Sequence, residues 1–472
     1  MTIKLSIALY LATTLFLFAQ TKDSSAMTLE ECISFAIENN LGLKSTKLSK
    51  ESWDVNFSQN KNALLPNING SYNLGISNGR SIDPYTNGIV NQELTFSNAA
   101  LGLDIVAFNG FRLLNRWKQA KLKLKSAEME VEAEKQALIL NVTLTYLRIL
   151  NAQDLVKLAK SRLKTTQKQL DRLRSLFEEE TGNPAEYHDL QGQLALDASS
   201  IVDYNNNLKT ELINLNSLLN TKTPITVAPF DLALDIAVYG YTAQDVYEQA
   251  LLVFPTIKVQ DLNLEAAEKA VAVAKSQYVP EVRLFANLNT NYSSAARLFN
   301  EVGTSVIETG GFVIIDSQNY AILKEESIFA SENIPYHNQF DNNLNSSIGL
   351  SVSIPIFNGF SAKNNVAIER IKEEEAQIAL AQIKLELKQA IDQSYSAMLA
   401  AYERYQLLLN QVDAFRESFR INEIRFNNGV SNSVEFIISK NNLDNAQTML
   451  ANVNYEYALR VRILEYYRGN RL

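Results

Sequence analysis

Four stretches of the chain alternate apolar and polar residues with a period of two. In the clearest one, Ile68, Tyr72, Leu74 and Ile76 lie on one side of the pattern, and asparagines and serines lie on the other. Successive side chains of a β-strand point to opposite faces, so this pattern predicts a strand with one apolar and one polar face. Residues 94–105, 282–292 and 348–356 show the same alternation. Each stretch has roughly the ten residues that a tilted strand needs to cross a bilayer.

The alternation slips in phase near 98–100, where we expect a β-bulge. A soluble sheet that is half-buried over a core also alternates, so this is the competing interpretation of the four strands. Two features favour a membrane: four strands are too few for a soluble sandwich in 472 residues, and the N-terminus has the pattern of an export signal.

Long helices fill most of the remaining sequence. After the second strand, apolar residues recur every three or four positions up to Phe177, with no proline between Phe111 and Gly182. This heptad-like spacing predicts a coiled-coil helix of about 70 residues, roughly 100 Å long. A return helix is expected over 185–220, and 360–428 and 434–467 repeat the plan. A further helix is expected from Thr28 to about Leu65, ended by a proline.

The strand-to-helix joint occurs twice, as Phe108-Asn109-Gly110-Phe111 and Phe357-Asn358-Gly359-Phe360. Asn109, Gly110, Asn358 and Gly359 are the residues that we expect to turn the chain there, because Asn-Gly tolerates unusual backbone angles. The joints are 249 residues apart (357 minus 108), whereas Pro66 and Pro280 are 214 apart (280 minus 66). The chain is therefore an internal duplication.

The duplication sets the expected domains. Residues 1–20 are a signal peptide, 21–230 the first repeat and 231–472 the second. Each repeat contains helices, a β-hairpin (about 66–107 and 281–357) and a long helical hairpin (about 111–220 and 360–467). The second copy has 35 extra residues between its proline and its joint, which we assign to a long polar surface loop over 293–343.

Composition excludes several functions. The apolar run after Lys4 is too short for a membrane anchor and fits an export signal. A net charge of −8 gives no global attraction to nucleic acid. Cys32 is the single cysteine, and His188 and His337 are the two histidines. With no phosphate-binding glycine loop either, we expect no catalytic residues, no metal, no cofactor and no enzyme activity.

Four strands cannot close a barrel, and an open sheet edge in lipid leaves backbone amides unpaired. The chain must therefore share its barrel with other copies of itself. Three copies give twelve strands, and two give only eight.

The chain resembles the TolC-like outer-membrane efflux proteins over about 28–468. The resemblance rests on the duplicated order of helix, proline, hairpin, joint, long helix, glycine turn and return helix, and on the segment 353–360, Ser-Ile-Pro-Ile-Phe-Asn-Gly-Phe. The first copy, 104–111, lacks the proline. The resemblance implies a mainly α-helical fold with transmembrane β-strands, in which a long coiled-coil helical barrel joins a trimeric twelve-stranded β-barrel.

The resemblance also implies function and partners. The chain would be a homotrimeric exit duct of a tripartite efflux or type I secretion system, in the outer membrane of a Gram-negative bacterium with a periplasmic extension. It would passively conduct substrates, contact outer-membrane lipids, and dock on a periplasmic adaptor (membrane fusion) protein and an inner-membrane RND, ABC or similar transporter. The competing hypothesis is a periplasmic coiled-coil adaptor or scaffold, which leaves the membrane-length strands unexplained.

The resemblance places the pore constriction at the second helical tip. Glu435 falls where family members have an acid that rings the aperture, and Phe426 at an aromatic tip position. Ser431 replaces an arginine and Ile438 a second acid, so the usual latch of charges is not carried over. Glu435 has a second interpretation, as an exposed acid that complements the start of a helix. The residues expected at the adaptor-docking tips are Gly182, Asn183, Asn427, Asn428, Gly429 and Val430.

Overall fold

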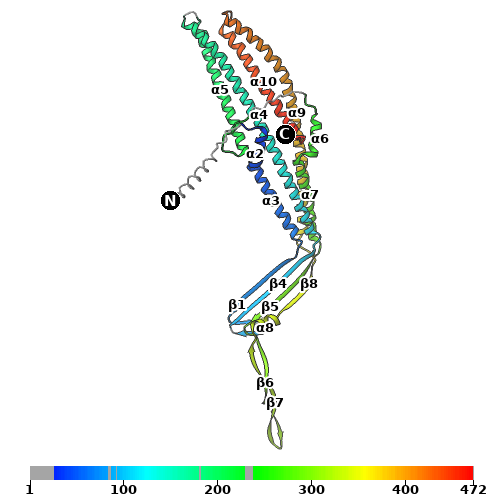
Figure 1. Ribbon diagram of the computed structural model, residues 1–472. Helices are drawn as coiled ribbons and strands as arrows, with labels where there is room; N and C mark the ends of the chain where they lie inside the picture. The colour runs from blue at the N-terminus through cyan, green and yellow to red at the C-terminus, as the bar shows by residue number, and fades with distance from the viewer. Residues whose placement is uncertain (1–25, 83–86, 92, 180–181, 229–237, 471–472) are drawn as a thin grey trace, which may run out of the picture. The chain divides into compact units, whose positions relative to one another are not determined.

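The computed structural model (Figure 1) describes residues 26–82, 87–91, 93–179, 182–228 and 238–470. The signal peptide expected over 1–20 lies outside these residues. None of the helices in the described part of the chain has an apolar stretch long enough to cross a membrane. The protein forms two compact units, and each unit draws on both halves of the sequence. We call them the sheet unit (the described residues of Asn56–Lys121 and Ala266–Glu373) and the helical unit (the described residues of Met1–Val55, Leu122–Glu265 and Glu374–Leu472).

The sheet unit is built on four antiparallel strands. They are β1 (Asn67–Ser77), β4 (Leu94–Phe108), β5 (Glu281–Ser293) and β8 (Asn345–Ser353), in the order β1-β4-β5-β8. These are the four strands that the alternation predicts. β1 and β8 each have one neighbour among the described strands, so within the described residues both outer edges carry backbone groups without a strand partner.

Two details of the strands differ from prediction. The bulge expected at 98–100 is wrong: β1 and β4 pair without a shift there, and the irregularity lies between Val106 and Phe108. The phase slip arises because Leu94 and Phe96 belong to the polar face, where Phe96 covers Gly75. β8 ends at Ser353 rather than near 357, two residues before Pro355, which has no N–H for a strand ladder.

The register gives the sheet two different faces. One face is apolar and largely exposed in the single chain; it contains Ile68, Leu74, Ile76, Leu101, Leu103, Leu284, Leu288, Ile348 and Leu350. The other is polar; it contains Asn67, Asn69, Asn73, Asn98, Asn287, Asn289, Asn291, Ser347 and Ser351. A sheet with water on one face and hydrocarbon on the other needs this division.

Two long helical hairpins dominate the helices. α4 (Arg112–Glu178) and α9 (Ser361–Asn427) have 67 residues each. α5 (Pro184–Leu219) and α10 (Ser433–Tyr467) return beside them with 36 and 35 residues. These bounds lie within a few residues of the predicted helices. Two large apolar cores lie in the helical unit, one around Tyr146 and Leu215 and the other around Ile391 and Leu464. Smaller ones lie around Phe436 and Val412.

The shorter helices repeat as well. α2 (Leu29–Asn39) begins with a capping box of Thr28 and Glu31, and α6 (Ala243–Val253) begins with the same box formed by Thr242 and Asp245. Such a box satisfies backbone N–H groups at the start of a helix. α3 (Leu41–Asn62) and α7 (Pro255–Lys275) follow. The single helix expected over 28–65 is therefore two helices, because the Asn40 side chain caps a new start at Leu43 N–H.

The segment expected to be a polar loop is a β-ribbon instead. β6 (Arg297–Ile315) and β7 (Gln318–Asn333) pair over almost their whole length, and the short helix α8 (Tyr336–Asn342) leads from the ribbon to β8. The turn at Asp316 and Ser317 has φ of 49° and 66° at its two central residues, the geometry that favours tight hairpins. A second, small ribbon joins β2 (Arg80–Ile82) and β3 (Ile89–Asn91).

Candidate functional site

The two strand-to-helix joints have the same backbone geometry. Gly110 and Phe111 have φ of 63° and 62°, and Gly359 and Phe360 have φ of 63° and 61°. Glycine adopts this left-handed conformation freely, whereas for phenylalanine it costs roughly 1–2 kcal/mol. Two successive residues in the left-handed conformation change the direction of the chain between the strand and the helix.

Aromatic contacts accompany each turn. The rings of Phe108 and Phe111 meet edge to face with centroids 5.5 Å apart, and Phe357 and Phe360 meet in the same way, also at 5.5 Å. Such pairs contribute roughly 0.5–1.5 kcal/mol beyond their burial, which offsets much of the backbone strain. The repeated tetrapeptide therefore encodes one structural device: the glycine permits the turn and the two phenylalanines hold it.

The asparagines of the joints accept hydrogen bonds from the first turn of the helix. The Asn109 carbonyl accepts from Arg112 N–H at 3.2 Å, and the Asn358 carbonyl from Ser361 N–H, also at 3.2 Å. The Asn109 side-chain oxygen accepts from Leu113 N–H at 3.4 Å. These contacts place all four predicted joint residues, Asn109, Gly110, Asn358 and Gly359, at the two turns.

The joints differ in what surrounds the glycine. A Cβ atom on Gly110 would lie 2.9 Å from Cβ of Val279, the residue before Pro280. At Gly359 no other atom of the described chain lies within 4 Å of the same position. In the first repeat, Leu65 corresponds to Val279, because 279 minus 214 is 65. The place that Val279 takes beside Gly110 is therefore open beside Gly359 in a single chain.

The polar face of the sheet has few charged side chains and two aromatic rings that lie flat against the strands. Phe96 lies over Gly75, and Phe285 over Gly349, each glycine being the register partner of its phenylalanine. A Cβ atom at Gly349 would lie 2.5 Å from the Phe285 ring. Glycine thus lets each ring lie flat against the sheet instead of projecting from the polar face. The charged side chain nearest the helices, Glu281, is paired with Arg112 at 2.6 Å and with Arg283 at 2.5 Å.

The second helical tip is a glycine-terminated turn. Gly429 has φ of 71°, and Val430 N–H donates to the Arg425 carbonyl at 2.8 Å, which closes α9 with a Schellman-type pattern. Asn427, Asn428, Gly429 and Val430 are all exposed at this turn. Asn432 then starts α10 by accepting from Glu435 N–H at 2.9 Å. The turn presents exposed backbone and one apolar side chain, Val430.

The first tip has the same plan. Asn183 caps α5 by accepting from Ala185 N–H at 3.0 Å, and Pro184 takes the first helical position. Gly182 N–H donates to the Leu176 carbonyl at 2.9 Å. Three residues after the cap comes Glu186, just as Glu435 follows Asn432 by three residues. The two tips therefore each pair an asparagine cap with an acid in the first turn, although sequence analysis singled out only Glu435.

The structure separates the three residues assigned to the constriction. Glu435 is exposed and lies 3.6 Å from the Arg425 guanidinium, a surface contact of small energetic weight. Ser431 is half-buried, and its hydroxyl oxygen has no hydrogen-bond partner within the described residues. Phe426 is 3% exposed and stacks on Phe436 with centroids 4.9 Å apart. In the single chain Phe426 is thus part of the core of the tip, and Glu435 is the only one of the three that is largely accessible.

That core joins the two helical tips. Phe426 and Phe436 of the second hairpin pack with Leu170, Leu173 and Leu190 of the first. The Arg172 guanidinium lies 5.7 Å from the centre of the Phe426 ring and also donates to the Asn427 side chain at 2.7 Å. The two tips are consequently one packed structure within the helical unit.

A buried charge network joins the same two hairpins further from the tips. Lys440, which is 1% exposed, donates to Asp197 at 2.9 Å and to Asp444 at 2.7 Å. Arg162 pairs with Asp444 at 3.1 Å, and Thr166 donates to Asp197 at 2.5 Å. Burial raises the pKa of the Asp444 carboxyl, and the nearby Lys440 and Arg162 limit the shift. Three helices, α4, α5 and α10, each contribute charged groups to this network.

Sequence reasoning missed this network. Its one visible signal is the pair Lys440 and Asp444, four residues apart on one helix face, and such pairs are usually exposed. Asp197 lies 243 residues from Lys440 in the chain, and nothing in the helical pattern of α5 distinguishes it from a surface acid.

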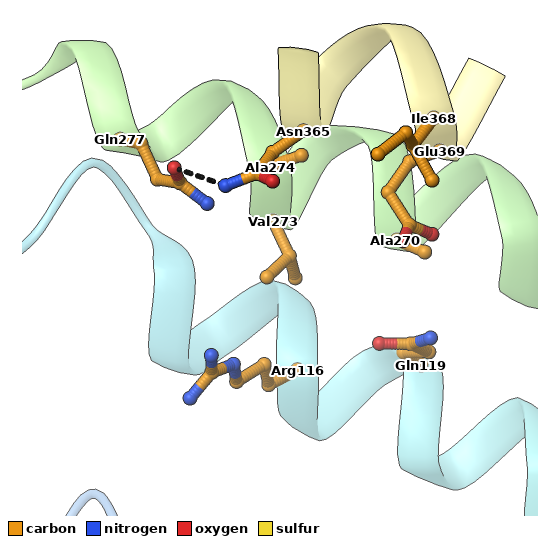
Figure 2. Close-up of a pocket in the computed structure, with 9 residues that line it drawn as sticks. All are labelled: Arg116, Gln119, Ala270, Val273, Ala274, Gln277, Asn365, Ile368 and Glu369. Atoms are coloured by element: carbon orange, nitrogen blue, oxygen red, sulfur yellow. Dashed lines mark hydrogen bonds between the residues drawn. The ribbon is translucent and has the colours of Figure 1, made fainter. Parts of the chain in front are cut away.

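A cavity of about 320 Å³ lies in the sheet unit where α7 runs between the starts of α4 and α9. Figure 2 shows the lining residues Arg116, Gln119, Ala270, Val273, Ala274, Gln277, Asn365, Ile368 and Glu369. Asn365 donates to Gln277 across it at 3.0 Å. The lining contains no nucleophile beside a base. Among the described residues, no group of three or more His, Cys, Asp or Glu side chains is placed to hold a metal ion.

Comparison with known proteins identifies the family. The outer membrane efflux protein family matches the chain twice, over residues 32–221 and 246–470. Together these segments cover most of the chain, one in each repeat, so the chain belongs to this family. It is an outer-membrane efflux channel protein with an internal duplication, located in the outer membrane with a periplasmic helical extension. A comparison with curated proteins finds no match.

Solved structures share the fold. The CmeC outer membrane channel of Campylobacter jejuni is 16% identical, with a TM-score of 0.75 over 93% of this chain and 85% of CmeC. The outer membrane protein VceC of Vibrio cholerae is 13% identical, with a TM-score of 0.73 over 94% of this chain and 96% of VceC. The MtrE outer membrane channel of Neisseria gonorrhoeae, in its open state, is 16% identical, with a TM-score of 0.69 over 94% of this chain and 89% of MtrE.

Proposed function

We propose that three copies of this chain close a twelve-stranded barrel and form a passive exit duct for efflux. The observation that supports this proposal is the four-stranded sheet, which has one apolar face, one polar face and two unpaired edges, β1 and β8. An unpaired edge in hydrocarbon costs several kcal/mol for each unsatisfied backbone group. Other copies of the chain supply matching edges, because β8 of one copy and β1 of the next are antiparallel as β4 and β5 are.

The internal repeat gives the register of this contact between copies. Within one chain, Gly102 on β4 lies opposite Asn287 on β5. Adding 249 to 102 gives 351, and subtracting 214 from 287 gives 73. Ser351 of one copy therefore lies opposite Asn73 of the next. By the same rule, Leu350 lies opposite Leu74 on the apolar face, where both side chains are more than half exposed in the single chain.

The polar face then lines the pore. Its asparagines, serines and glycines offer hydrogen bonds to water and little net charge, so the barrel section conducts without strong charge selectivity. The flat rings of Phe96 and Phe285 keep the bore open. The protein itself contributes no reaction, metal or cofactor, and the energy comes from its partners.

The helical hairpins form the periplasmic section of the duct. We assign adaptor docking to Gly182, Asn183, Asn427, Asn428, Gly429 and Val430 at the two tips, and the constriction to Glu435 with Ser431 nearby. The partners are a periplasmic adaptor protein and an inner-membrane transporter of the RND, ABC or a similar class. We place the boundary between the two structural repeats near 230, with a signal peptide over 1–20.

A pair of cysteines tests the closure of the barrel. Ser351→Cys and Asn73→Cys in one chain should form a disulfide between copies, because cross-strand Cα atoms lie about 4.5–5.5 Å apart, within the range for a disulfide. The matched control is Ser351→Cys with Asn69→Cys, which is four residues out of register, or about 13 Å along the strand. We expect oxidised trimers, resistant to boiling in detergent, only with the first pair. Equal cross-linking by both pairs, or none by the first, contradicts the proposed barrel.

A further inference from the structure

The ribbon formed by β6 and β7 leaves a large apolar surface exposed. Its outer part, residues 309–323, contains Asp316 as its single charged residue. Seven apolar side chains there are between 44% and 64% exposed: Phe312, Val313, Ile314, Ile315, Tyr320, Ile322 and Leu323. We call residues 309–323 the distal hairpin. Apolar side chains lie on both of its faces, because neighbouring residues such as Phe312 and Val313 point to opposite sides.

The inner part of the ribbon is different in character. Residues 297–308 and 324–333 carry five glutamates and two basic residues, Arg297 and Lys324. This part also exposes apolar side chains such as Phe299, Val302 and Val306, but they lie among charged residues. Its strands pair through the backbone. Two side-chain hydrogen bonds also cross between the strands, from Thr304 to Glu325 at 2.7 Å and from Arg297 to Ser331 at 3.4 Å. The charged residues end at Glu308 and Lys324, and beyond them the exposed apolar surface has almost no charge. An exposed apolar surface without charged neighbours marks the distal end as an interaction surface.

The base of the ribbon is fixed to the sheet. The Gln339 side chain, 1% exposed on α8, donates to the carbonyls of Ser293 and Ile334 at 3.0 and 2.8 Å and accepts from Ser293 N–H at 2.9 Å. Asn343 donates to the Asn291 carbonyl at 2.9 Å. Thr290 donates to the Phe340 carbonyl at 2.7 Å. The ribbon therefore projects from the sheet in a set direction, as Figure 1 shows for β6 and β7.

Lipid does not fit as the cover for the distal hairpin. The ribbon starts from the end of the sheet opposite to the four helix connections, and its 19-residue strand β6 extends roughly 60 Å at about 3.3 Å per residue. The hydrocarbon core of a bilayer is about 30 Å thick, and the four strands of the sheet already span it in the proposed barrel. The distal hairpin thus lies in water beyond the membrane, where isolated two-stranded ribbons are only marginally stable.

We propose that the distal hairpins of the three copies pack against one another and form an apolar cap on the outer side of the duct. This inference rests on the proposed trimer. Each copy brings the same ribbon, from the same edge of the sheet, to the same height, because β7 leads through α8 into β8, which joins the next copy. In the proposed trimer the other copies are always present beside this ribbon, so they can cover the distal hairpin without a further partner.

The charge distribution agrees with contact at the distal end. Three inner parts with an excess of glutamate repel one another, whereas the distal hairpins have almost no charge and high β-propensity, which suits close apolar and strand-to-strand contact. The ribbons should therefore converge at 309–323 and separate nearer the sheet.

Single cysteines test this arrangement in the complete trimer. Gln318→Cys lies at the distal turn, and Asn300→Cys near the base is the control. The native Cys32 does not interfere, because it is fully buried and its surroundings raise the pKa of its thiol to about 11. We treat purified trimers and intact outer membranes with a short bis-maleimide. We expect Gln318→Cys to give covalent oligomers and Asn300→Cys to give none.

A second variant separates apolar packing from mere proximity. Phe312→Ser with Ile314→Ser, added to Gln318→Cys, should abolish the covalent oligomers and make the ribbon sensitive to chymotrypsin, while the trimer itself persists. The inference is overturned if Gln318→Cys gives no product between copies in an intact trimer, if the serine substitutions leave the product unchanged, or if Gln318→Cys is captured by another envelope protein instead. The Ser351→Cys and Asn73→Cys disulfide, scored in parallel, shows whether the trimer has formed.

Discussion

The Lys440 ammonium lies 2.9 Å from the carboxylate of Asp197 on the neighbouring hairpin, and both side chains are buried. Removing one partner from a buried ion pair leaves an uncompensated charge, which costs about 3–5 kcal/mol. We therefore expect Lys440→Met to lower the free energy of unfolding by about that amount, because Asp197 and Asp444 both lose their ammonium partner. Denaturant unfolding in detergent, followed by circular dichroism, measures the change.

Lys157 provides the control for this substitution. It pairs with Asp154 at 3.0 Å on the surface of α4, where its side chain is 72% exposed. Lys157→Met should change the free energy of unfolding by less than about 0.5 kcal/mol. Equal effects of the two substitutions would contradict a structural role for the buried network.

The same network predicts a pH dependence. Burial raises the pKa of Asp444 in the folded protein above its ordinary value near 4, so the folded state holds this proton more tightly than the unfolded state. Stability should therefore fall as the pH rises from the ordinary aspartate pKa through the raised one, and the loss should be complete above both. Asp444→Asn should flatten this slope. If Asp444→Asn leaves the dependence of the unfolding free energy on pH unchanged across the mildly acidic range, Asp444 is not the source of that dependence.

The two joint glycines allow a matched test of assembly. Alanine at either Gly110 or Gly359 is strained by a φ of 63°, at a cost of roughly 1–2 kcal/mol. Gly110→Ala also meets Val279, and overpacking of this kind typically adds 1–3 kcal/mol. In the trimer, Leu65 of the next copy should take the place of Val279 beside Gly359. We therefore expect Gly359→Ala to slow trimer formation and to equal Gly110→Ala in its effect on trimer stability. If Gly359→Ala remains clearly milder in the assembled protein, Leu65 does not occupy that place.

Substitutions of Glu435 and Glu186 test whether Glu435 forms a pore constriction or only stabilises the start of its helix. Both follow an asparagine cap by three residues, so both complement the start of a helix, a contribution of roughly 0.3–1 kcal/mol. Three copies of Glu435 around one axis would also attract cations. We expect Glu435→Gln to reduce the cation preference of single-channel currents in planar bilayers, and Glu186→Gln to leave it unchanged. Identical behaviour of the two variants assigns Glu435 to helix capping alone.

Local patterns in the sequence predicted the elements well because they depend on neighbours in the chain. Alternation specified four strands and their two faces, and heptad spacing specified helices of 67 residues to within a few positions. The repeated joint tetrapeptide predicted two equal turns, which both have the left-handed glycine and phenylalanine. The errors have different causes. Phe96 covers Gly75 on the neighbouring strand, which gave the false impression of a bulge. β8 ends just before Pro355, earlier than its apolar residues suggested.

What the sequence by itself determined is therefore the duplicated order of strands and helices, since periodicity and turn residues act over a few positions. Only the tertiary structure revealed the burial of Phe426 against Phe436, the charge network around Lys440 and the ribbon of β6 and β7. Each depends on segments that are brought together by folding: Asp197 is 243 residues from Lys440, and Phe436 belongs to a different helix from Phe426. Burial and charge pairing are properties of such encounters, and a pattern along the chain does not contain them.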